Sequence, residues 1–213
     1  MQNTVDKILK EKIIVIVRGV EREALIPLAE ALFEGGIRLL ECTFDAKGET
    51  PDSETADRIK MLAEHFGDKM EIGAGTVLTE KQVKLTRAAG GKFIISPDTN
   101  EAVIKRTKRE GLVSIPGALT PTEAVLAHNA GADFVKLFPV GRLGAGYIKD
   151  LAAPLSHIRF LAVGGIDAET MADYLKNGAL GIGVASAIVD KKMIAAGDWK
   201  GITALAKQYT EKI

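Results

Sequence analysis

The stretch IIVIVRGVEREALIPLAEALFEGGIRLLECT, residues 13–43, decides the fold class. It begins with a continuous apolar run, Ile13 to Val17, which is typical of a strand buried on both faces. A helical pattern follows from Arg22 to Glu34 and ends at Gly35-Gly36, because glycine commonly ends helices. A second strand pattern occupies residues 37–43. The stretch is therefore predicted to form one βαβ unit with parallel strands.

The same alternation of short apolar runs and longer amphipathic stretches continues along the chain. Further strands are expected near residues 70–72, 93–95, 112–115, 134–137, 158–163 and 179–184. The total of roughly eight strands is the number that closes a (β/α)8 barrel. An open doubly wound sheet would carry a Gly-x-Gly-x-x-Gly turn after its first strand, and Arg18-Gly19-Val20 has none. The sequence predicts a single-domain α/β protein over residues 1–213, a (β/α)8 TIM barrel.

Helix ends have local chemical markers. Thr79 and Thr120 are of the type that caps a helix amino terminus, and Pro121 suits the first turn. Five glycines follow helical segments and are expected to adopt the left-handed conformation that ends a helix: Gly67, Gly90, Gly111, Gly131 and Gly178.

Charge and cysteine content limit the classes of function. The chain has 28 basic and 28 acidic residues, so no net field favours nucleic acid or an anionic membrane as a partner. Cys42 is the only cysteine, which excludes an internal disulfide and a cysteine-rich zinc site. A reducing cytoplasm is the expected compartment. The amino terminus lacks the apolar core of a signal peptide, and no apolar stretch is long enough to span a bilayer.

Lys136 is the most informative residue, because it interrupts the apolar run of residues 133–139, DFVKLFP. A buried ammonium is costly, and a lowered pKa leaves a neutral amine that can attack a ketone and form a Schiff base. The alternative is an edge-strand lysine whose long side chain reaches solvent. The residues around the expected barrel mouth favour the first interpretation.

Active sites of (β/α)8 barrels lie at the carboxyl ends of the strands, so polar residues there are candidates. The candidates are Arg18, Glu41, Thr43, Thr76, Ser96, Lys136 and Ser186, with Pro97 beside Ser96. The three histidines, His65, His128 and His157, fall elsewhere and are interpreted as non-catalytic. Without a cluster of His, Asp or Glu at ligand spacing, neither a metal nor another cofactor is expected.

Glu41 and Arg18 each allow two interpretations. A carboxylate within the apolar stretch of residues 39–43 is costly to bury, so Glu41 either forms a structural salt bridge with Arg18 or Lys136 or moves protons for a reactive amine. Arg18 is either the structural partner of that carboxylate or a clamp for a substrate carboxylate.

Two glycine-containing turns match the phosphate-binding loops of many barrels. Gly164-Gly165 follows the seventh expected strand, and residues 183–186 follow the eighth. Backbone N–H groups in such loops bind phosphate. The polar stretch of residues 44–54 is either a mobile flap over the site or a solvated loop before a helix that starts near Pro51.

These motifs together resemble the 2-keto-3-deoxy-6-phosphogluconate aldolase and 4-hydroxy-2-oxoglutarate aldolase family, which are class I aldolases on a (β/α)8 barrel. The resemblance covers nearly the whole chain. It rests on Val17-Arg18, Glu34-Gly35-Gly36, residues 40–43 (LECT), 72–77 (IGAGTV) and 95–97 (ISP), Pro116-Gly117, residues 120–123 (TPTE), 136–139 (KLFP) and 163–166 (VGGI).

The resemblance implies a role for each matching residue. Lys136 would form the Schiff base, and Glu41 would be the general acid and base. Arg18 and Thr76 would bind the keto-acid end of the substrate, and Pro97 and Phe138 would line the pocket. The substrate chain and its distal phosphate would lie along Val163, Gly164, Gly165 and Ser186.

Three residues depart from the family pattern. Asp45 occupies a position where some members carry an arginine. Val163 replaces the threonine of typical phosphogluconate enzymes. A valine at this position is more similar to the 2-dehydro-3-deoxy-6-phosphogalactonate aldolases. Ala185 occupies a position where glycine is common in the family, and its methyl group leaves less room for the backbone to approach a phosphate.

The leading hypothesis is a carbon–carbon lyase that cleaves a 2-keto-3-deoxy-6-phospho sugar acid, or 4-hydroxy-2-oxoglutarate, to pyruvate and an aldehyde. A phosphogalactonate-type substrate is the alternative within the family. Two other classes remain: a phosphate-binding barrel isomerase or synthase without covalent lysine chemistry, and a non-catalytic sugar-acid binding protein. The family resemblance also implies a homotrimer.

Overall fold

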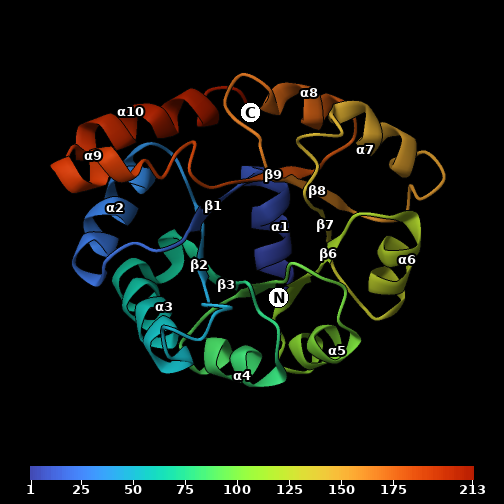
Figure 1. The fold of residues 1–213 in the computed structure, drawn as a ribbon, viewed down its shortest axis with the longest axis horizontal. Coiled ribbons are helices and arrows are strands. Elements are labelled where there is room, and N and C mark those ends of the chain that lie inside the picture. Colours follow the sequence, from blue (N-terminus) through green and yellow to red (C-terminus); the bar gives the residue numbers. More distant parts are fainter.

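The computed structural model describes residues 1–213 and contains one parallel sheet. Its strands are β1 (Ile13–Val17), β2 (Leu39–Thr43), β3 (Glu71–Gly75), β4 (Phe93–Ile95), β5 (Val113–Ile115), β6 (Gly117–Ala118), β7 (Val135–Leu137), β8 (Phe160–Val163) and β9 (Gly181–Val184). They are hydrogen-bonded in the order β5-β4-β3-β2-β1-β9-β8-β7-β6. The strands rise as a ring around a common axis (Figure 1).

The two outer members of this order, β5 and β6, are one strand interrupted at Pro116. Proline has no N–H to donate to the ladder, so regular pairing stops there. The interrupted strand still accepts hydrogen bonds from the β7 side: Phe134 N–H donates to Ser114 O, and Lys136 N–H donates to Pro116 O at 2.8 Å. The ring therefore closes with eight strand positions, and the predicted (β/α)8 barrel is confirmed.

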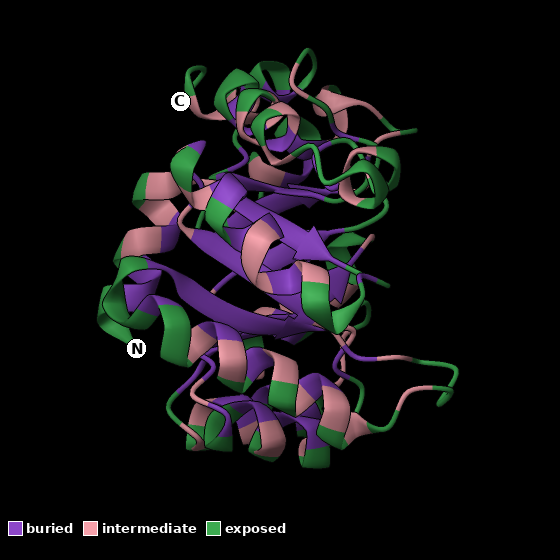
Figure 2. Ribbon diagram, turned by 90° about the vertical axis from the view of Figure 1, so that its left-hand side faces the viewer, coloured by how far each residue is buried: buried purple, intermediate pink, exposed green.

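Ten α-helices accompany the strands. They are α1 (Gln2–Glu11), α2 (Arg22–Glu34), α3 (Asp52–Phe66), α4 (Glu80–Ala88), α5 (Glu101–Arg109), α6 (Pro121–Asn129), α7 (Ala145–Ala152), α8 (Met171–Lys176), α9 (Lys191–Ala196) and α10 (Trp199–Thr210), with a 3-10 turn at Gly67–Lys69. Helices α2 to α10 surround the ring, and the strands between them are almost wholly buried (Figure 2). No helix is both long and apolar enough to cross a bilayer.

Local chemistry explains most helix ends. Thr79 and Thr120 both form capping boxes, and all five glycines predicted to end helices have positive φ. The second strand begins at Leu39 and not at residue 37, because Ile37 N–H still donates to Leu32 O at the end of α2.

Helix α1 lies inside the ring in Figure 1, and no expected element of the sequence corresponds to it. Its apolar residues Val5 and Ile8 pack in one cluster with inward-facing strand residues, Ile14, Leu39, Phe93, Ile95, Val113, Ile115, Phe134 and Leu161. The helix therefore closes the amino-terminal end of the barrel. The carboxyl end stays open to solvent.

Candidate active site

An open cavity of about 810 Å³ occupies the carboxyl end of the barrel. All ten residues to which the family resemblance assigns a role line it: Arg18, Glu41, Thr76, Pro97, Lys136, Phe138, Val163, Gly164, Gly165 and Ser186. These residues come from seven different strands or the loops after them. The fold thus brings the full set together at the expected end of the barrel.

The strand register explains why Glu41 and Lys136 meet. Side chains alternate between the two faces of a strand. Leu39 and Phe134 point into the barrel beneath α1, so Glu41 and Lys136, two residues further along their strands, also point inward. Both side chains line a small enclosed cavity of about 10 Å³ with six hydrophobic neighbours.

Lys136 is buried in a central strand, since β7 pairs with β6 on one side and β8 on the other. Its exposed fraction is 7%, and its Nζ lies 4.6 Å from the centroid of the Phe138 ring. Burial lowers the pKa of Lys136, and the Arg18 cation lowers it further, while Glu41 opposes the shift. The interpretation of Lys136 as an edge-strand lysine is wrong.

Glu41 is 1% exposed and forms neither of the salt bridges considered for it. Its Oε2 has no hydrogen-bond partner. Burial raises the pKa of this carboxyl group, while Lys136 and Arg18 act in the opposite direction. An unpaired buried carboxyl group is costly for stability, and it is suited to exchanging protons with a substrate.

Gly75 makes room for the Glu41 side chain. A Cβ placed on Gly75 would overlap Oε1, Cδ and Cγ of Glu41. In the β2–β3 register Glu41 pairs with Gly73, and Gly75 lies two residues further along β3, on the same face of the sheet. The absence of a side chain at Gly75 is therefore a condition for the observed position of the carboxyl group.

Arg18 and Thr76 form a polar pair beside Glu41. The Arg18 Nη2 donates to Thr76 Oγ1 at 3.0 Å. Thr76 has φ 55°, a left-handed conformation that is rare for a β-branched residue and that concentrates at functional sites. A guanidinium beside a hydroxyl group is suited to binding a carboxylate.

The loops after β8 and β9, which also line the cavity, contain backbone donors that are not used within the chain. The N–H groups of Gly164, Gly165, Ser186 and Ala187 donate no hydrogen bond within the chain. Gly164 and Gly165 have φ values of 98° and 73°, which only glycine adopts readily. Free N–H groups of this kind are suited to binding an anion.

The three departures from the family pattern have distinct structural consequences. The Asp45 carboxylate accepts the N–H groups of Lys47, Glu49 and Thr50, which lowers its pKa and organises the loop before α3. Val163 packs over Gly183, where a Cβ would come within 2.8 Å of Val163 Cγ2. Ala185 lines the cavity and accepts the N–H groups of the following turn.

Several other polar candidates have structural contacts. Ser96 Oγ donates to Val77 O at 2.7 Å, and Thr43 Oγ1 donates to Val17 O at 3.3 Å. His65 lies 3.0 Å from Glu30, and the His128 and His157 rings contact each other, so none of the histidines lines the cavity. Burial raises the pKa of Cys42 to about 12, so this thiol is no nucleophile. No cluster of side chains is arranged to hold a metal ion.

The cavity also contains two charged residues that the sequence analysis missed, Asp167 and Lys191. Asp167 accepts hydrogen bonds from Glu169 N–H and from the N–H and hydroxyl of Thr170, which lowers its pKa. Lys191 lies at the start of α9. No motif in the local sequence points to either residue.

A buried lysine of lowered pKa beside a carboxylic acid, at the carboxyl end of a (β/α)8 barrel, is the arrangement of a class I, Schiff-base-forming aldolase. The family model of the 2-keto-3-deoxy-6-phosphogluconate (KDPG) and 4-hydroxy-2-oxoglutarate (KHG) aldolases matches residues 5–205. The chain belongs to this aldolase family.

Individual relatives agree with this assignment. A 2-dehydro-3-deoxy-phosphogluconate aldolase of Treponema pallidum is 36% identical over 87% of this chain and 86% of its own length. A 2-dehydro-3-deoxy-6-phosphogalactonate aldolase of Escherichia coli is 32% identical over 96% of this chain and 97% of its own length. The crystal structure of a Legionella pneumophila KDPG aldolase, with pyruvate captured as a covalent carbinolamine, is 30% identical and superposes with a TM-score of 0.85 over 95% and 96% of the two chains.

Proposed function

We propose that the protein is a class I aldolase that reversibly cleaves 2-keto-3-deoxy-6-phosphogluconate to pyruvate and glyceraldehyde 3-phosphate. Cleavage of 4-hydroxy-2-oxoglutarate to pyruvate and glyoxylate is a second reaction of the same site. The observation that carries the proposal is the buried Lys136 amine of lowered pKa, which faces the unpaired Glu41 carboxyl group in one cavity. The 213 residues then form one catalytic domain.

The reaction begins at the substrate ketone. The neutral amine of Lys136 adds to C2 and gives a carbinolamine. Glu41 in its acid form donates a proton to the C2 hydroxyl group, which leaves as water, and a protonated imine forms. The raised pKa of Glu41 favours the acid form that this step requires.

The carbon–carbon bond breaks in the next step. Glu41, now a carboxylate, accepts the proton of the C4 hydroxyl group. The electrons of the C3–C4 bond move toward the imine nitrogen, so the aldehyde departs and an enamine remains on Lys136. Protonation of C3 and hydrolysis of the imine release pyruvate and restore the amine.

The cavity walls would orient the substrate during these steps. Arg18 and Thr76 bind its carboxylate. The free N–H groups near Gly164, Gly165 and Ser186 bind the distal phosphate, a role supported by their lack of partners within the chain. Pro97, Phe138 and Val163 contact the carbon chain in between.

A phosphogalactonate-type substrate is the second candidate, and Val163 favours it. The methyl groups of Val163 pack on Gly183 and present an apolar surface beside Lys136, where a threonine would offer a hydroxyl group. Such a hydroxyl distinguishes substrates that differ at one stereocentre. Relative kcat/KM for the 6-phosphorylated gluconate and galactonate derivatives and for 4-hydroxy-2-oxoglutarate decides between them.

The covalent step is tested by incubating the protein with pyruvate and borohydride and locating the reduced adduct by peptide mass spectrometry. We expect one adduct, on Lys136, and none in Lys136→Met. An adduct on another lysine would reassign the nucleophile. Failure to label under conditions that label a known class I aldolase would favour the isomerase or binding-protein class.

We further propose that the protein is a homotrimer in the cytoplasm. The family resemblance supports the oligomer, and the exposed leucines Leu126, Leu143 and Leu180 are available as apolar contact area. Sedimentation equilibrium gives the mass of the assembly, and a monomer across the micromolar range would exclude the trimer.

A further inference from the structure

We propose that Lys191 is a specificity-determining residue that binds the phosphate group at the distal end of the substrate and so selects phosphorylated aldehydes. The inference rests on the proposed aldolase function and assigns a side chain to an end of the site that otherwise offers only backbone N–H groups and the Ser186 hydroxyl. No ligand has to be assumed beyond a phosphate monoester.

The position of Lys191 links two walls of the cavity. Lys191 follows the turn that contains Ser186 and Ala187, and all three residues line the cavity. Its Nζ lies 3.9 Å from the point that a Cβ on Gly19 would occupy. The amine therefore extends from the start of α9 toward the loop after β1, and both residues line the cavity.

The Lys191 ammonium has no partner within the chain. It takes part in no salt bridge, although ten such pairs form elsewhere in the molecule. The acids of the cavity do not neutralise it. Asp167 is held by its bonds to residues 169 and 170, and Glu41 lies deep in the barrel beside Lys136.

Charge balance indicates the kind of ligand. The cavity is lined by three basic residues, Arg18, Lys136 and Lys191, and two acidic ones, Glu41 and Asp167. In the proposed reaction Lys136 becomes the imine and Arg18 faces the carboxylate. Lys191 is then the only cation left for a second anion, and it lines the same cavity as the free N–H groups of residues 164, 165, 186 and 187.

The test uses the condensation direction, so that the aldehyde varies while pyruvate stays the same. In Lys191→Met, the KM for glyceraldehyde 3-phosphate should rise about 5- to 20-fold, the loss expected for one partly solvated charge-assisted contact. The kcat and the KM for unphosphorylated glyceraldehyde should stay within about twofold. Lys191→Arg should retain most of the preference for the phosphorylated aldehyde.

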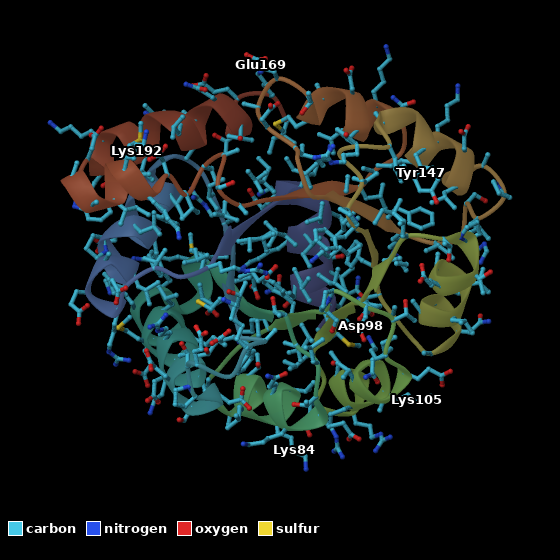
Figure 3. All side chains as sticks on the ribbon, viewed as in Figure 1. Lys84, Asp98, Lys105, Tyr147, Glu169 and Lys192 are labelled. Carbon is cyan, nitrogen blue, oxygen red and sulfur yellow. The ribbon has the colours of Figure 1, made fainter.

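The matched control is Lys192→Met. Lys192 is the next residue of α9, is exposed, does not line the cavity and lies on the outer ring of helices (Figure 3). We expect wild-type kinetics with both aldehydes. An equal effect of the two variants would show a general surface-charge effect and overturn the proposal, as would a Lys191→Met enzyme with unchanged KM for the phosphorylated aldehyde.

Borohydride trapping of pyruvate separates this proposal from the proposed function. Trapping requires Lys136 and no phosphate, so it should be unaffected in Lys191→Met. If Lys191→Met retains trapping and its preference for the phosphorylated aldehyde is unaltered, only the role of Lys191 is refuted, and the aldolase function stands. Absent trapping in the wild-type protein would refute the aldolase function itself.

Discussion

The two ends of the barrel bury the same chemical group in opposite ways. At the amino-terminal end, Glu71 of β3 is 4% exposed, and its carboxylate accepts Lys7 Nζ at 2.7 Å and Thr4 Oγ1 at 3.1 Å, both from α1. At the carboxyl end, Glu41 of the neighbouring strand β2 is 1% exposed and Oε2 has no partner. One carboxylate is fully partnered, and the other is not.

The difference separates stability from reactivity. A buried carboxylate with a cation and a hydroxyl donor is stabilised in its charged form, and removing one partner is destabilising. A buried carboxyl group without partners stays available to a substrate at a cost in stability. We therefore assign a stabilising role to the partnered carboxylate at the amino-terminal end and the proposed chemistry to the unpartnered one at the carboxyl end. Substitutions that affect one property at each end test this division.

The largest expected effect is that of Lys136→Met. The variant should lose all measurable turnover and imine trapping, because no other amine faces Glu41 at the base of the cavity. Its stability should not fall. The native pKa of Lys136 lies below its unfolded value, so the lysine destabilises the fold at every pH below the unfolded pKa, neutral pH included, and this penalty disappears with the lysine.

Thermal and denaturant unfolding measure the second half of this prediction. We expect Lys136→Met to be as stable as the wild type or more stable by about 1 kcal/mol. A clear loss of stability would mean that the amine contributes to the fold, and the division between the two ends would fail.

The second prediction compares the two glutamates directly. Glu41→Gln should slow turnover about 10²- to 10⁴-fold, the usual contribution of a general acid and base, without loss of stability. Glu71→Gln should leave kcat within about twofold and lower the free energy of unfolding by about 1–3 kcal/mol, because Lys7 loses its charged partner. Steady-state kinetics and urea unfolding of both variants are needed, and the same pattern in both would contradict the comparison.

The third prediction concerns Gly75. In Gly75→Ala the added methyl group would occupy the position of the Glu41 carboxyl group and force it aside. We expect kcat to fall about 10²-fold, with borohydride trapping slower than in the wild type but still directed to Lys136, since the nucleophile is untouched. Gly146→Ala is the matched control, because a Cβ there meets no atom within 4 Å. Normal turnover in Gly75→Ala would show that Glu41 does not need its observed position.

The sequence predicted those parts of the fold that depend on local chemistry. Helix α2, Arg22–Glu34, has the predicted bounds, and the glycines at helix ends have positive φ as expected. The sequence also predicted Glu41 and Lys136 as site residues, because each is a charged residue within an otherwise apolar strand pattern. All ten proposed site residues line one cavity, while their roles remain predictions.

Features that depend on the closed ring could not be predicted. Val5 and Ile8 give α1 an apolar face, but only the ring of strands provides the interior that covers it. In the sequence Lys191 has the pattern of an exposed helix residue, and only the folded chain shows that its amine lies near Gly19. The steric requirement at Gly75 likewise depends on the β2–β3 register, which no single segment contains.

The smallest expected effect is a displaced pH profile. Only the neutral amine of Lys136 attacks pyruvate, so the rate of imine trapping at saturating pyruvate rises with pH through the pKa of Lys136. The Arg18 cation lowers that pKa, and Glu41 opposes the lowering. The midpoint should therefore move to higher pH in Arg18→Met and to lower pH in Glu41→Gln. Lys7→Met, which removes a cation at the amino-terminal end, should leave the midpoint in place, and a shift in this variant comparable to that in Arg18→Met would show that the two ends are electrostatically coupled.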